Sequence, residues 1–379
     1  MPIYKAEGKK DGLQKYNVRV NYISKGGEPK QLTRTAYGLE SAKDLERNLI
    51  NEVKVSDKNP VKKMTVRQLF NEYIAAKKYE VKESTVDKAI RDFDYYIFPT
   101  LADVRIDRLT TPMLQEWKLG MEQRGLAYRT KKQAFNDFRV MLNYAVKMEY
   151  LTSNPIVKVG NFKNPTGTKT EMNIYTDKEF KKFISTVKRQ AELQQLNQQE
   201  LSGWDYYVFF AIAFYTGLRK GEIHALKWSD LNGAYLSVRR SINQRLKGGD
   251  RETTPKTKSS VRTLQMPLPL IKILKEHKAR QKKLKHFTDD YRICGGVMPL
   301  RDNSLLQRNR KYAKLAGLKT IRIHDFRHSH VSLLANNGIN IQEIARRLGH
   351  ARVEETWNTY SHLYPNAEEK AVDILNRIY

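Results

Sequence analysis

The chain has little of several features that define common classes of protein. Its 379 residues include a single cysteine, Cys294, which excludes an internal disulfide and a cysteine-based zinc finger. A lone cysteine among apolar neighbours is most often a buried small hydrophobe. The longest apolar run, from Tyr206 to Tyr215, is far shorter than the roughly 18 residues of a membrane span, and the first residues lack the apolar segment of a secretion signal. We therefore expect a cytoplasmic protein without a membrane anchor.

Acidic residues are scarce relative to basic ones. Lysine and arginine number 69 against 41 aspartates and glutamates, so the formal net charge is +28, and the excess is spread along most of the chain. A positive field of this size attracts polyanions. Nucleic acid is therefore the leading partner, and a very basic but otherwise ordinary protein is the alternative. A membrane surface is disfavoured because no long basic amphipathic segment has a continuous apolar face.

Residues 1–56 have the pattern of a small sheet with a helix packed on it. Apolar and polar residues alternate from Tyr16 to Ile23, a turn follows at Gly26 and Gly27, and a returning strand is predicted over Gln31 to Tyr37. Apolar residues at helical spacing come next. The exposed face of this sheet contacts DNA or is an ordinary solvated face. We expect it to carry Lys15, Arg19, Lys30 and Arg34.

Residues 64–158 follow a polar linker and show helical periodicity. Helices are predicted from Thr65, from Ser84, from Thr110 and over Tyr128 to Met148, which makes a compact four-helix domain. Its basic side chains are candidates for contact with the DNA backbone, with a merely solvated surface as the alternative. The candidate DNA-binding residues are Lys77, Lys82, Arg129, Lys131 and Lys132.

Residues 174–379 form the largest segment, after a second polar linker. An apolar helix is predicted over 204–218 and short strands within 234–241, 251–256 and 261–266, and the rest is mainly helical. The apolar helix ends in TGLRKGE, where Arg219 follows a glycine. A guanidinium at the mouth of a buried element is poorly solvated and binds an oxyanion, and Glu222 can brace it. Taken alone, this motif is better explained as a surface Arg–Glu pair than as an oxyanion-binding site.

Two further segments carry polar side chains suited to chemistry. Lys256 lies in TPKTKSSVR, a predicted hairpin tip, and a lysine can protonate a leaving alkoxide, although exposed hairpin lysines are common. The segment IHDFRHSH places His324 and Arg327 three residues apart on one helical face, while we expect His328 and His330 to point elsewhere and to serve packing. No glutamate stands at the spacing of a zinc motif, so we predict no metal site.

The sequence Leu348-Gly349-His350, followed ten residues later by a tyrosine, completes a specific pattern. In order and spacing, it resembles the six-residue active site of tyrosine recombinases of the phage integrase family, strongly over residues 175–379. The six matching residues are Arg219, Lys256, His324, Arg327, His350 and Tyr360.

The resemblance implies a multidomain, mainly α fold in three parts. These are a small N-terminal three-stranded β-sheet plus helix that binds arm-type DNA sites (1–56), a four-helix core-binding domain (64–158) and an α+β catalytic domain (174–379). It also implies site-specific cleavage and rejoining of DNA strands, which integrates and excises a mobile element without a cofactor. Double-stranded DNA, a homo-tetramer on DNA, accessory excision and DNA-bending proteins, and a nucleoid-associated place in a bacterial cell are implied with it.

The resemblance assigns a role to each matching residue. Arg219 and Arg327 would hold the non-bridging oxygens of a phosphate, and His350 would add a hydrogen bond. Tyr360 would attack phosphorus to form a 3′-phosphotyrosyl bond, and Lys256 would protonate the leaving 5′-oxygen. A phenol is under-ionised at neutral pH, so His324 or the cationic pocket must help to remove its proton.

Several alternatives stay open from the sequence alone. Tyr364 and Tyr379 are other possible nucleophiles, although the spacing from His350 favours Tyr360. A DNA-binding regulator without chemistry and a type IB topoisomerase are other functions for the same pattern. The C-terminal segment 366–379 has apolar residues at helical spacing and docks on a neighbouring protomer or packs within its own chain.

Overall fold

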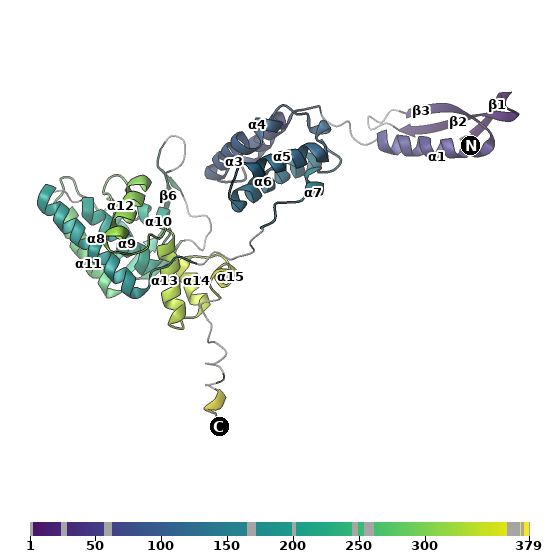
Figure 1. Cartoon of the computed structure of the whole chain (residues 1–379). Coiled ribbons are helices and arrows are strands. Elements are labelled where there is room, and N and C mark those ends of the chain that lie inside the picture. The colour runs from purple at the N-terminus through teal and green to yellow at the C-terminus, as the bar shows by residue number, and fades with distance from the viewer. Residues whose placement is uncertain are drawn as a thin grey trace. The chain divides into compact units, whose positions relative to one another are not determined.

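The computed structural model describes residues 3–23, 29–56, 63–164, 172–198, 202–244, 249–253, 261–361, 372 and 375–378. The chain divides into two units, Met1–Gly167 and Thr168–Tyr379, and each is described by itself (Figure 1). Lys256, Tyr364 and most of the segment 366–379 lie outside the described residues. In the part that is described, no helix combines the length and the apolar character needed to cross a membrane.

The N-terminal part of the first unit is a three-stranded antiparallel sheet with a helix on one face (Figure 1). Val18, Ala36, Ala42 and Leu49 are buried between the sheet and the helix. The alternation of residues located the second and third strands but not the first, which is exposed along most of its length. The elements are β1 (Ile3–Lys10), β2 (Leu13–Ile23), β3 (Pro29–Tyr37) and α1 (Leu39–Ser56).

The register of β2 and β3 corrects the predicted exposed face. Val18 is fully buried and pairs with Arg34, and residues that face each other across an antiparallel pair point to the same side of the sheet. Arg34 therefore lies on the α1 side, as does Lys30, four residues away along the strand. The prediction that both share the open face with Lys15 and Arg19 was wrong. The open face carries Lys15, Asn17, Arg19, Asn21, Gln31, Thr33 and Thr35.

The second part of this unit is a helical bundle, and its four predicted helices are confirmed. The Thr65 side chain and the Gln68 side chain cap each other's backbone at the first helix, and the Thr110 hydroxyl accepts from the backbone of Met113 at the third. The bundle encloses an apolar core that includes Phe70, Phe93 and Phe138. Its helices are α2 (Val66–Lys77), α3 (Glu83–Tyr96), α5 (Thr111–Gln123) and α6 (Tyr128–Lys147), with the short α4 (Phe98–Leu101), η1 (Ile106–Arg108) and α7 (Ile156–Val159).

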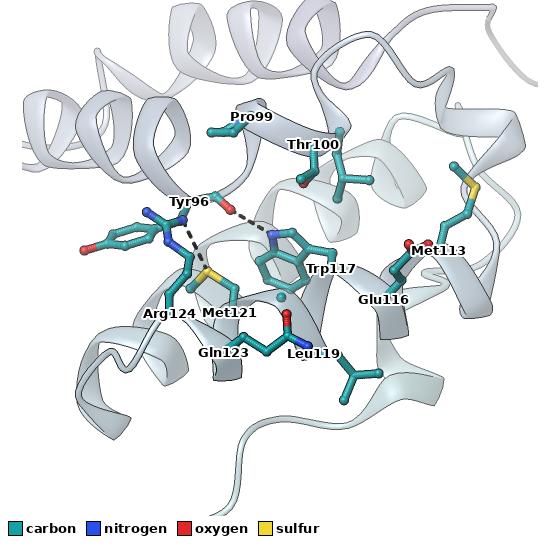
Figure 2. A pocket seen from close by; sticks show the side chains of 12 residues that line it. Tyr96, Pro99, Thr100, Met113, Glu116, Trp117, Leu119, Met121, Gln123 and Arg124 are labelled. Atoms are coloured by element: carbon teal, nitrogen blue, oxygen red, sulfur yellow. Dashed lines mark hydrogen bonds between the residues drawn. The ribbon is translucent and has the colours of Figure 1, made fainter.

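A hollow of about 740 Å³ opens on the bundle between the end of α3, α4 and α5 (Figure 2). The Trp117 indole lies along it and donates to the Tyr96 carbonyl oxygen at 2.8 Å. Most of the lining is apolar, and the polar side chains around it include Glu116, Gln123 and Arg124. The hollow therefore lacks the histidines and paired carboxylates of a catalytic centre.

The second unit is built around α9 (Ser202–Thr216), which is apolar on all sides and almost entirely buried. Cys294 is also fully buried, as predicted. Strands β4 (Leu231–Asn232), β5 (Tyr235–Val238) and β8 (Arg262–Gln265) form one small sheet, in that order, and β6 (Ser241–Asn243) pairs with β7 (Arg251–Thr253) in another. The other elements are α8 (Asp177–Gln198), α10 (Lys220–Ala225), η2 (Trp228–Asp230), α11 (Leu268–Gln281), α12 (Asp302–Leu315), α13 (Asp325–Asn336), α14 (Ile341–Leu348) and α15 (Val353–Tyr360).

The fold class is the one predicted: mainly helical, with an N-terminal three-stranded sheet, a helical bundle and an α+β second unit. The predicted apolar helix corresponds to α9, and the predicted strand regions contain β5, β7 and β8. Strand β4 was not predicted, and β6 begins where the first predicted region ends. Helices α13, α14 and α15 contact one another at the C-terminal side of this unit (Figure 1). They bring residues near 327, 350 and 360 to the end of α9.

Candidate active site

Arg219 is placed by the sharp turn that ends α9. Gly217 has a φ of 65°, and a Cβ at this position would lie 2.7 Å from Cδ2 of His330, so both the backbone conformation and the close packing require glycine. The turn makes Arg219 the residue before α10. Its backbone N–H donates to Glu222 Oε2 at 2.9 Å and its Nη1 to Glu222 Oε1 at 3.1 Å. Glu222 therefore contacts both the backbone and the side chain of Arg219.

Glu222 also holds a second arginine. Its side chain is 4% exposed, and its Oε2 accepts from Nη2 of Arg262, at the start of β8, at 3.0 Å. Nε of Arg262 donates to the backbone carbonyl of Arg347 at 2.9 Å. Burial opposes ionisation of Glu222, but the charges and hydrogen bonds of Arg262 and Arg219 outweigh it, and the pKa of the carboxyl stays below its ordinary value. Arg262 was not assigned from the sequence, although it is the last residue of the predicted hairpin segment TPKTKSSVR.

Arg327 lies at the floor of the site and is 2% exposed. Its Nη1 donates to the carbonyl of Gly217 at 2.8 Å, and its Nη2 to the carbonyl of Leu348 at 3.0 Å. Burial, and then the charge of Arg219, lower its pKa to about 9, so the guanidinium remains charged at neutral pH. One buried cation thus ties the end of α9 to the end of α14.

His350 contacts the same guanidinium. Nε2 of His350 lies 2.7 Å from Nη2 of Arg327, and Nδ1 lies 2.7 Å from Oγ1 of the buried Thr356. Arginine can only donate, so Nε2 is the acceptor, and the proton of the neutral ring belongs on Nδ1. Desolvation, followed by the charges of Arg327 and Arg219, lowers the pKa of His350 to about 4. The ring is therefore neutral at physiological pH.

Tyr360, at the end of α15, is buried beside this pair. It is 2% exposed and packs with Val331, Ile344 and Leu348. Desolvation raises the pKa of its phenol to about 12, although the charge of Arg327 acts in the opposite direction. The hydroxyl lies 2.6 Å from Nδ1 of His328.

The contact of Tyr360 corrects the interpretation of the histidine segment. Residues four apart share a helical face just as residues three apart do, so His328 lies beside His324, with ring centroids 5.0 Å apart. His324 is exposed, and among the described residues it is His328 that hydrogen-bonds the phenol. The i, i+4 spacing was the signal that could have found it. His330 is a packing residue as predicted, because it is buried and its Nδ1 contacts the carbonyl of Phe214 at 2.8 Å.

The predicted DNA-binding residues lie on the first unit. Arg129 and Lys132 are exposed on α6, with the Lys132 ammonium 5.5 Å from the ring of Tyr128. Lys77 contacts the Tyr73 hydroxyl. Lys131 is half-buried and forms an ion pair with Glu122, so a phosphate would compete with that carboxylate. Lys82 precedes the first turn of α3. Within the residues described, no three histidine, cysteine or acidic side chains gather as a metal site requires.

Comparison with known proteins finds a matching family model in each of the two units. A sequence model described as the phage integrase family matches residues 175–367, and one described as the phage integrase SAM-like domain matches residues 65–164. The ICEBs1 integrase of Bacillus subtilis (strain 168) is 28% identical over 374 residues, which is 97% of each chain. A protein named tyrosine recombinase XerC-like, from Caldanaerobacter subterraneus subsp. tengcongensis, is 29% identical over 311 residues, 74% of each chain.

Solved structures show the same fold. The Tn1549 transposon integrase in complex with a circular intermediate DNA matches with a TM-score of 0.64 and 23% identity, covering 82% of this chain and 99% of that one. A lambda integrase tetramer bound to a Holliday junction matches with a TM-score of 0.54 and 16% identity, covering 93% of this chain and 96% of that one. At these identities the likeness establishes the architecture.

Proposed function

The chain belongs to the phage integrase family and is a site-specific tyrosine recombinase of mobile elements; from this premise we propose that Tyr360 is the residue with which it cuts DNA. Arg219 and Arg327 bind the scissile phosphate, and the negative charge of that phosphate favours protonation of His350, which then donates to it. The observation that carries the proposal is the buried Arg327 guanidinium, which holds His350 at 2.7 Å and lies near the Tyr360 phenol.

Two arginines of unlike exposure suit one phosphate. The Arg219 side chain is 39% exposed and can reach a ligand from solvent, whereas Arg327 is fixed at the floor. After desolvation, the charge of Arg219 is the next cause that lowers the pKa of Arg327, so the two cations repel each other in the absence of DNA. A phosphate between them would relieve this repulsion. The negative charge on the two non-bridging oxygens of the phosphate increases as the reaction proceeds. A planar guanidinium group can donate two parallel hydrogen bonds to such oxygens.

The covalent step exchanges one ester bond for another. The Tyr360 oxygen attacks phosphorus, a 3′-phosphotyrosyl bond forms, and the bond from phosphorus to the 5′-oxygen breaks. Lys256, outside the described residues, gives a proton to the departing 5′-oxygen. Since the energy of the ester is kept in the protein–DNA bond, rejoining is the same exchange in reverse, and no nucleotide cofactor takes part.

The rest of the chain supplies binding to double-stranded DNA. We propose that residues 1–56 bind arm-type sites, that 64–158 bind the crossover site, and that 174–379 perform catalysis. The open face of the N-terminal sheet supports the first assignment, because it presents amides and hydroxyls with Lys15 and Arg19, and such groups read base edges in a groove. The exposed Arg129 and Lys132 on α6 suit phosphate contact in the bundle.

Strand exchange between two duplexes cut on both strands requires four copies of the active site. We therefore propose a homo-tetramer on DNA, with accessory excision and DNA-bending proteins to set direction. The lambda integrase relative was solved as a tetramer on a Holliday junction, which supports the same assembly here. An enzyme of this kind acts at the nucleoid in the cytoplasm of a bacterial cell.

Covalent trapping on a nicked DNA site tests the nucleophile. Cleavage beside a nick releases a short fragment, so the protein stays attached and migrates with the DNA under denaturing conditions. We expect Tyr360→Phe to bind the site and form no adduct, because phenylalanine lacks the attacking oxygen. Tyr364→Phe is the matched control and should form adduct at the wild-type rate. Adduct formation by Tyr360→Phe would remove the assignment.

A further inference from the structure

Among the residues that the structure describes, one side chain hydrogen-bonds the phenol of Tyr360. Its oxygen lies 2.6 Å from Nδ1 of His328, and the two rings are tilted by 54° with centroids 5.5 Å apart. A separation of 2.6 Å is at the short end for a hydrogen bond between a ring nitrogen and a hydroxyl. The side chains come from different helices, α13 and α15, so packing of the two helices sets this contact.

The direction of this hydrogen bond follows from the protonation states. Desolvation lowers the pKa of His328 below 6.5, and the nearby Arg322 and Arg327 act in the same direction against Asp325. The ring is therefore neutral at physiological pH, and its Nδ1 can accept. A phenol is a stronger donor than acceptor, so the favoured arrangement has the Tyr360 O–H donating to Nδ1 and the ring proton on Nε2.

The phenol needs such an acceptor. With a pKa of about 12, roughly one phenol in 10⁵ is ionised at pH 7. A proton can be removed during attack by a group within about 2.6–3.2 Å of it, and such general-base assistance contributes roughly 10²- to 10⁴-fold. His328 satisfies this distance, whereas His324 lies one helical turn away and is exposed.

On the basis of the proposed function of Tyr360, we propose that His328 is a catalytic residue: it orients the phenol through Nδ1 and takes its proton as the oxygen attacks phosphorus. The phenol O–H bond breaks, the O–P bond forms, and the proton stays on Nδ1 while Lys256 protonates the leaving 5′-oxygen. In the rejoining step the imidazolium returns this proton to the departing Tyr360 oxygen. His324 is then left to contact the DNA.

The assignment predicts how cleavage depends on pH. Within the described part of the chain, the charged and titratable groups that act on or contact His328 are Arg322, His324, Asp325, Arg327 and Tyr360. Because the pKa of His328 is below 6.5, its ring is a competent acceptor at and above that pH. The rate of wild-type cleavage should therefore not change with pH above about pH 6.5. At lower pH the rate should decrease, because the protonated ring cannot accept the proton of Tyr360.

The decisive variant is His328→Asn, tested on the nicked DNA site. The asparagine Oδ1 can occupy the place of Nδ1 and accept the hydrogen bond, but it cannot hold a proton near neutral pH. We expect DNA binding and thermal unfolding close to wild type, cleavage reduced by about 10²-fold or more at pH 7, and a rate that rises tenfold for each pH unit. Replacing Tyr360 with difluorotyrosine, a more acidic phenol, should restore much of the loss in His328→Asn.

His324→Asn is the matched control, since it removes the other histidine of the same helical face. Whatever its rate, it should keep the wild-type pH profile. The inference fails if His328→Asn cleaves with the wild-type rate and profile, or if His324→Asn acquires the tenfold slope instead. Tyr360→Phe measured beside them separates the two claims: an adduct with that variant overturns the proposed nucleophile, whereas its absence together with normal cleavage by His328→Asn overturns the role of His328 alone.

A measurement on the unsubstituted protein covers the case in which His328→Asn does not fold. Nitrogen NMR of histidine-labelled protein distinguishes a bare acceptor nitrogen from a protonated one. The resonance of His328 should show an unprotonated Nδ1 and a protonated Nε2 at pH 7. A proton on Nδ1 would make the ring the donor to Tyr360 and would contradict the inference.

Discussion

The charged residues of the N-terminal sheet and those of the active site differ in what surrounds them. Arg19 is exposed on the open face of the sheet, with its guanidinium 5.4 Å from the ring of Tyr4. Glu222 and Arg327, by contrast, are almost fully buried, and each has partners from distant parts of the chain. Exposed charges attract DNA collectively, and any one of them is replaceable. Buried charges with fixed partners hold the surrounding side chains in one arrangement, so their replacement affects chemistry or stability.

The largest effect in this comparison is expected for Arg219→Lys. Lysine keeps the positive charge but cannot donate two parallel hydrogen bonds to a phosphate. We expect cleavage of the nicked site to fall by about 10³-fold, at the upper end for loss of one donor to a developing oxyanion, with binding in a band-shift assay changed only a few-fold. Arg310→Lys, exposed on α12, is the control. An equal loss of binding and cleavage would show that Arg219 acts as a general phosphate contact.

Glu222→Gln should mainly affect stability. The variant leaves Arg262, 7% exposed, without its carboxylate, and we expect a loss of about 3 kcal/mol in the free energy of unfolding, measured by urea at pH 7. The folded-state pKa of Glu222 is lower than its usual 4.5, so the carboxylate stabilises the fold above that pH and loses this contribution as the pH falls through the folded value. The difference between wild type and variant should shrink accordingly.

The control for this prediction is Glu343→Gln. Glu343 is paired with Arg346 at the surface, where both side chains are about half exposed or more. An exposed pair contributes roughly 0–1 kcal/mol, so this variant should unfold close to wild type at pH 7 and at acidic pH. A loss at Glu222 no greater than that at Glu343 would mean that burial of the active-site carboxylate has no energetic consequence.

The smallest effect distinguishes the two faces of the sheet. Arg19→Ala, on the open face, should weaken binding to arm-type DNA a few-fold and reduce the slope of log affinity against log salt by about one. Arg34→Ala, on the α1 side, should leave both quantities nearly unchanged. Titration of a labelled DNA at three salt concentrations would check this. Equal effects would mean that the charge of the whole sheet matters and not its open face.

Much of the fold could be predicted because the signals are local. Alternation over Tyr16 to Ile23, the caps at Thr65 and Thr110, and the apolar run of α9 each specify an element within one stretch of sequence. The first strand was harder to locate, since a mostly exposed edge strand has no apolar face to mark it. The side of the sheet on which Arg34 lies depends on the register between two strands, and a strand pattern alone does not fix it.

In the active site, too, local features could be predicted from the sequence, whereas contacts between distant segments could not. The types and order of the site residues are read directly from the sequence. The contact between Arg219 and Glu222 could be anticipated there, because three residues at a helix start are a local distance. Packing between distant segments determines that Arg262 shares this carboxylate and that His328, and not His324, contacts Tyr360. These contacts join segments 40 and 32 residues apart, and their distances are set by how α10 packs with β8 and how α13 packs with α15.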